Sequence, residues 1–145
     1  GRLELPVTEG LSLLPAGGPL LPEGDRGEVL AALLSVEDRP VVVDCGTDPT
    51  GPRLAVAAAA SRSLLVLRPC YLALRRAMSA PLRPSGVILV EEPGRALGAD
   101  DVGAVLGVPV RAVIACEPRI ARAVDAGLLV HRLPGSMARA LGRAA

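Results

Sequence analysis

An aspartate at the end of an apolar run is the first residue in this sequence that could do chemistry. Residues 41–43 are all valine, Asp44 follows them, and a turn-rich loop comes next at residues 45–49. Ligands of parallel α/β sheets bind outside the carboxyl ends of the strands, where a free carboxylate can meet a magnesium ion or its water shell. The pattern fits equally well an aspartate that caps a loop or the next helix, so both interpretations stay open.

Three cysteines are the other candidates for a site. Cys45, Cys70 and Cys116 each follow a predicted strand and could approach one edge of a parallel sheet. Zinc and iron–sulfur sites use closely spaced cysteine pairs and a fourth ligand, but this chain has no CxxC pair. Buried free cysteines that act as small apolar residues are commoner, and an odd number of cysteines argues against a disulfide framework. We therefore predict no metal held by these cysteines and a reducing compartment.

Composition excludes several mechanisms. The 145 residues contain 16 basic side chains, all of them arginine, against 15 acidic ones, so the net charge is +1 and no lysine is present. This balance, with 1% aromatic residues, provides neither the charge nor the stacking surfaces that nucleic-acid binding needs. No nucleophile-elbow sequence occurs, and His131 is interpreted as a structural or surface residue. We predict no catalytic residue.

Sequence patterns typical of strands and of helices alternate along the chain. Short continuous apolar runs, typical of strands buried on both faces, predict strands at residues 11–14, 41–43, 64–67, 87–90 and 110–115, and a weaker one at 128–133. Apolar residues spaced three or four positions apart predict helices at residues 27–36, 52–60, 71–79, 100–107, 118–126 and 134–143. The alternation predicts a single α/β domain over residues 1–145, with a mostly parallel sheet of about five to six strands and helices on both faces.

The opening segment and the lengths of the apolar runs indicate the cellular location of the protein. Arg2, Glu4 and Glu9 interrupt the start, which excludes a signal-peptide pattern, and a first residue Gly1 is typical of a cut or processed chain. The longest apolar runs are far shorter than the ~20 residues that a membrane span needs. We expect a cytoplasmic domain without a transmembrane segment, and a fragment of a longer protein is one interpretation of its start.

Five segments share their order and spacing with one known family. They are residues 41–44 (VVVD), 64–69 (LLVLRP), 86–90 (GVILV), 106–110 (LGVPV) and 114–119 (IACEPR). Together they resemble the MinD/ParA class of P-loop ATPases, from Gly10 to the end of the chain. The resemblance implies a P-loop NTPase-like, Rossmann-like three-layer fold in which residues 10–17 form the strand after the first switch. It also implies that Asp44 is the Walker B aspartate and that Glu117 and Pro118 border the nucleotide base.

The sequence departs from the family pattern at the positions that would bind the phosphates and the base of the nucleotide. The phosphate-binding loop of the family is a glycine-rich turn that carries lysine, and arginine is a poor substitute in so tight a loop. The adjacent pair Gly17 and Gly18 is followed by Pro19 and fits an ordinary turn. Glu91 and Glu92 stand where the family usually has an asparagine that contacts the base, and paired carboxylates would repel phosphate. The first P-loop strand is thus absent, and we expect no ATPase activity and no cofactor for this chain alone.

Two functional hypotheses follow from the resemblance. The first is a pseudo-ATPase or protein-interaction module in cell division, partitioning or polar assembly, with a protein partner or a homodimer. The alternative is the C-terminal part of an ATP-dependent positioning ATPase whose Walker A loop lies upstream or in a partner. In that case Mg-ATP is the cofactor, Asp44 holds the water shell of the magnesium ion, and Glu117 and Pro118 border the base.

Under either hypothesis the missing P-loop strand leaves the edges of its neighbouring strands without a partner. In doubly wound P-loop sheets the P-loop strand lies centrally, beside the Walker B strand, so its absence leaves two edges unpaired or brings them together. We expect a shortened relative to pair residues 41–43 directly with residues 64–67, or to dimerise.

Overall fold

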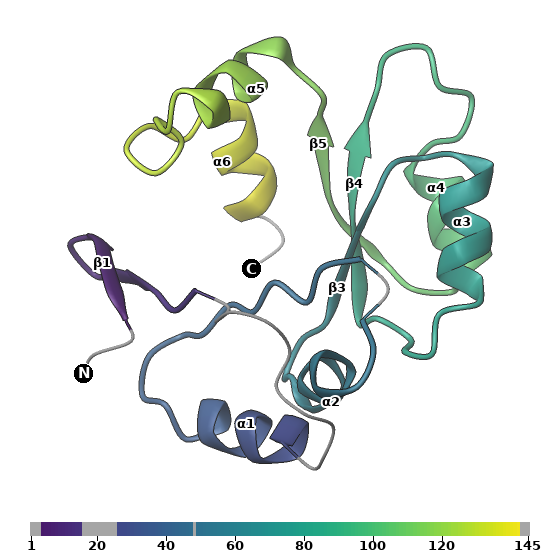
Figure 1. Ribbon diagram of the computed structural model, residues 1–145. Helices are drawn as coiled ribbons and strands as arrows, with labels where there is room; N and C mark the ends of the chain where they lie inside the picture. The colour runs from purple at the N-terminus through teal and green to yellow at the C-terminus, as the bar shows by residue number, and fades with distance from the viewer. Residues whose placement is uncertain (1–3, 16–25, 48, 143–145) are drawn as a thin grey trace.

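Helices and strands alternate through most of the chain in the computed structural model, which describes residues 4–15, 26–47 and 49–142 (Figure 1). The elements are β1 (Leu5–Thr8), β2 (Leu11–Leu13), α1 (Arg26–Ser35), α2 (Pro52–Ala59), β3 (Leu64–Leu67), α3 (Tyr71–Met78), β4 (Gly86–Glu91), α4 (Ala99–Leu106), β5 (Val110–Ala115), α5 (Pro118–Asp125) and α6 (Gly135–Gly142).

The central sheet has three parallel strands among the described residues, in the order β3-β4-β5. Leu64 of β3 lies opposite Gly86 of β4 and the register continues without a shift, whereas the pairing of β4 with β5 shifts between Val87 and Ile88. The strands predicted at residues 64–67 and 110–115 are confirmed to the residue. The α/β class and the parallel sheet are therefore observed, but the described sheet has three strands rather than five to six.

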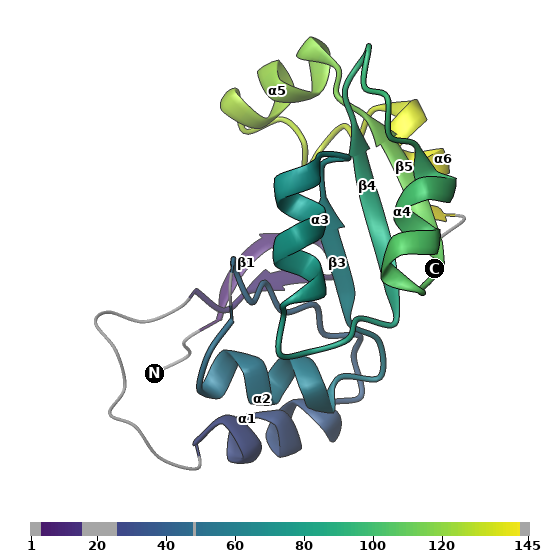
Figure 2. The same ribbon diagram turned by 90° about the vertical axis from the view of Figure 1, so that its right-hand side faces the viewer.

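The core lies between this sheet and one pair of helices. Val87 and Leu89 of β4 and Val102 of α4 have no exposed surface, and Leu74 of α3 and Leu67 of β3 pack with them. Helices α3 and α4 cover this face of the sheet, and α6 lies on the opposite side, against β5 (Figures 1 and 2). On this face the middle strand is fully buried, because it has strand neighbours on both sides and helices over it (Figure 2).

All six predicted helices form, and their ends follow the expected signals. Pro52 and Pro118 are the first residues of α2 and α5, where the missing N–H costs no helical hydrogen bond. Gly107 ends α4 with a left-handed φ of 63° and donates its N–H to the Gly103 carbonyl at 2.9 Å. Across the described stretches, no helix combines the length and the apolar character needed to cross a bilayer.

Two predicted strands are not part of the parallel sheet. Residues 11–13 form β2, which pairs antiparallel with β1 in a separate two-stranded hairpin. Residues 128–133 form turns, because the Leu128 N–H bonds to the Ala123 carbonyl and the N–H groups of His131 and Arg132 bond to the Leu128 carbonyl. These local hydrogen bonds use the backbone groups that a strand ladder would need, so the strand predicted at residues 128–133 was wrong. The strand predicted at residues 11–14 is confirmed over Leu11–Leu13, but it belongs to the hairpin and not to the parallel sheet.

The valine run at residues 41–43 is also not a strand. The segment is extended and passes the lower part of β3 (Figures 1 and 2), but the valines are exposed and Val42 is 96% accessible. β-branched residues favour extended backbone, but a strand also needs a neighbour with which to exchange hydrogen bonds. Within the described chain no strand pairs with this segment, so the expected direct pairing of residues 41–43 with residues 64–67 is not observed.

Candidate functional site

Asp44 lies in an exposed turn after the extended valine segment. Its Oδ1 accepts a hydrogen bond from the Gly46 N–H at 2.8 Å, and Gly46 has a left-handed φ of 70°. A carboxylate that accepts from the backbone two residues on stabilises a turn of this kind. The structure thus shows the loop-capping contact that one of the two interpretations of Asp44 predicts.

Glu117 precedes α5, and Pro118 is the first residue of that helix. The Glu117 carboxylate forms an ion pair with Arg119 and accepts a hydrogen bond from the Ser136 hydroxyl at 3.1 Å. Arg119 in turn donates to the same hydroxyl at 3.2 Å. The hydrogen bond from Arg119 is the main reason that the pKa of Glu117 is lowered. Glu117 therefore stabilises a helix–helix contact in this structure.

The three residues that the resemblance connects with a nucleotide do not lie together. The segment that ends in Asp44 lies near the start of β3, whereas α5 begins beyond the carboxyl end of β5 (Figure 1). No hydrogen bond or ion pair joins them among the described residues. One loop-bonded carboxylate and one ion-paired carboxylate at separate places, without a lysine in the chain, do not form a site that fits Mg-ATP.

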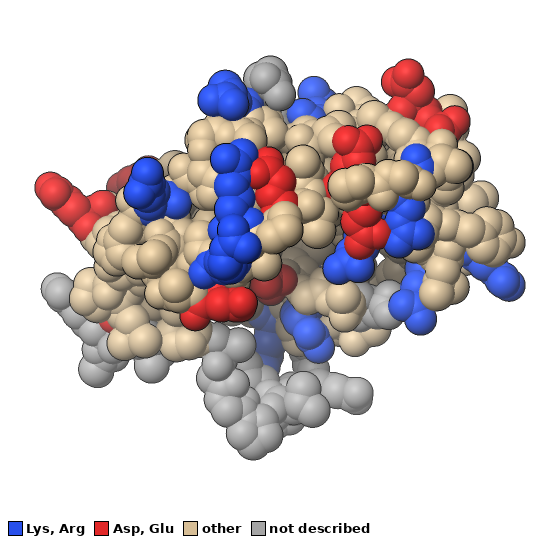
Figure 3. Space-filling model, turned by 90° about the horizontal axis from the view of Figure 1, so that it is seen from above, with Lys and Arg blue, Asp and Glu red and all other residues tan. Residues whose placement is uncertain are grey.

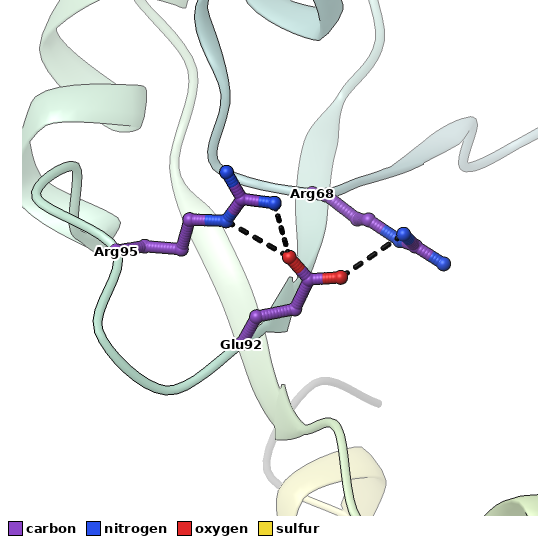
Figure 4. Close-up of polar contacts among 3 residues, drawn as sticks. All are labelled: Arg68, Glu92 and Arg95. Carbon is purple, nitrogen blue, oxygen red and sulfur yellow. Dashed lines mark hydrogen bonds and ion pairs between the residues drawn. The ribbon is translucent and has the colours of Figure 1, made fainter.

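A cluster of three charged residues occupies the carboxyl edge of the sheet (Figure 4). Glu92, which follows β4, binds Arg68 through Oε1 at 3.0 Å and accepts from Arg95 Nε through Oε2 at 2.8 Å and also from Arg95 Nη2. The Glu92 side chain is 22% exposed. Because Arg68 follows β3, the carboxylate ties together the loops after two adjacent strands. The sequence placed Glu92 at this edge, but only the structure shows that two guanidinium groups bind it.

The same edge carries charges of both signs (Figure 3). A hollow of about 240 Å³ lies beside the cluster and is lined by Glu91, Glu92, Pro93, Gly94, Arg95 and Ala115. A carboxylate held by two guanidinium groups is a poor proton acceptor, since these partners stabilise its ionised form. We find no acid–base or nucleophilic arrangement at this edge in the part that the structure describes.

The opposite face of the sheet, away from α3 and α4, is apolar and only partly covered. A groove of about 440 Å³ runs between this face and helices α5 and α6. Val66, Ile88, Val90 and Ile114 line it from the strands, and Val66 is 60% exposed. From the helices and the preceding loop it is lined by Cys116, Glu117, Ile120, Ala121, Met137 and Leu141. The groove is mostly apolar, with Glu117 as the one charged residue among the described residues of its lining, and the strand patterns gave no sign that it would be open.

The cysteines do not form a site in the structure. Cys45 and Cys70 are half-buried and Cys116 is exposed, and all three are free thiols. In the ranges that the structure covers, no three His, Cys, Asp or Glu side chains lie close enough to hold a metal ion. His131 is exposed in the turn after α5, in agreement with its interpretation as a structural or surface residue.

The Glu92 cluster gives a prediction for pH. The hydrogen bond from Arg95 is the largest cause that lowers the pKa of Glu92 from the usual 4.5, and Arg68 contributes least. A lowered pKa in the folded state means that the ion pair stabilises the fold above the ordinary pKa and that this contribution disappears as pH falls through the folded value. We expect Arg95→Gln to return the pKa of Glu92 toward 4.5, with a smaller change for Arg68→Gln. Carbon-13 NMR titration of the Glu92 carboxyl would measure both, and an equal shift in the two variants would contradict this geometry.

Comparison with known proteins identifies no relative for this chain. No protein family, curated protein or solved structure matches it. The likeness to the MinD/ParA class accordingly remains a hypothesis from the sequence, and the function has to be inferred from the contacts and surfaces of the chain itself.

Proposed function

We propose that this chain is a MinD/ParA-like domain that acts through protein contacts and does not bind or hydrolyse ATP by itself. The observation that carries the proposal is the uncovered apolar face of the sheet, with its groove between Val66, Ile88, Val90 and Ile114 and helices α5 and α6. Exposed apolar surfaces of this kind mark sites where another molecule binds. By its resemblance, the process would be cell division, partitioning or polar assembly in the cytoplasm.

The arrangement of charged groups supports the same proposal. The Asp44 carboxylate accepts from its own loop, Glu117 is paired with Arg119, and Glu92 is bound by two arginines. No lysine is available to offset the charge of a phosphate. Each residue that could take part in nucleotide chemistry therefore has a structural contact instead.

One observation favours the alternative, in which a Walker A loop is supplied from upstream or by a partner. Asp44 is exposed, and no cation pairs with it in the described segments. Its second carboxylate oxygen could then face a magnesium ion that arrives with the missing loop. Under this alternative, Asp44→Asn would remove nucleotide binding from a longer polypeptide that contains such a loop.

Calorimetric titration of the chain with Mg-ATP tests the main proposal. We expect no saturable binding at submillimolar nucleotide, because the described side chains form no phosphate site. Asp44→Ala should lower the free energy of unfolding, measured with urea, by no more than about 1 kcal/mol, since it removes one exposed hydrogen bond to the Gly46 N–H. Saturable binding that Asp44→Ala removes would overturn the proposal and favour a nucleotide switch.

A further inference from the structure

We draw no further inference here: the strongest candidate, the apolar groove between the parallel sheet and helices α5 and α6, belongs to the surface on which the proposed function already rests, and nothing in the structure shows what covers it.

Discussion

Replacing Leu89 by alanine is expected to lower the free energy of unfolding by about 2–5 kcal/mol, the usual range for a fully buried leucine. Leu89 lies in the middle strand, has no exposed surface and belongs to the small core that the sheet shares with α3 and α4. The loss should be a large part of the free energy of unfolding of the whole domain, which is usually only about 5–15 kcal/mol. Urea unfolding followed by far-UV circular dichroism measures it.

Leu72→Ala is the matched control for this prediction. Leu72 belongs to α3 and is 57% exposed, so the same chemical change should cost no more than about 0.5–1 kcal/mol. If the two variants lost equal stability, the core would not lie between the sheet and α3 and α4. The comparison therefore tests the packing of the parallel sheet directly.

The second large effect is expected at Gly27, where α1 meets α2. A Cβ atom at this position would lie 2.7 Å from the Pro52 Cα and 2.8 Å from the Ala55 Cβ. Neither neighbour is the end of a flexible side chain, so the helices must separate to admit the methyl group. We expect Gly27→Ala to cost about 1–3 kcal/mol, as overpacking usually does, and to speed amide exchange in both helices.

Gly103→Ala in α4 provides the control for Gly27. Its Cβ would lie 3.6 Å from the Val108 carbonyl oxygen, which is an ordinary contact. Alanine is favoured over glycine inside a helix by roughly 0.5–1 kcal/mol, so this variant should be as stable as the parent chain or slightly more so. A loss of stability at Gly103 and none at Gly27 would contradict the observed pairing of α1 with α2.

For the candidate site residues, the sequence could predict where each one lies along the chain but not which residues it contacts. Glu92 was expected at the end of a strand, and it lies there, but its bonds to Arg68 and Arg95 depend on two loops that meet in space. Asp44 was expected at the carboxyl end of a sheet strand, but residues 41–43 are not a strand, and its carboxylate bonds within its own turn. Hydrogen-bond partners that come from distant segments have no signature in local spacing.

The sequence by itself determined where the six helices lie and where the three strands of the parallel sheet lie, because these patterns depend on side chains a few positions apart. The first-turn prolines of α2 and α5, the glycine that ends α4 and the apolar run of β3 are examples. Only the tertiary structure decided which extended stretches share a sheet. Residues 41–43 and 64–67 have nearly the same local pattern, but only the latter has a neighbouring strand with which its backbone can exchange hydrogen bonds.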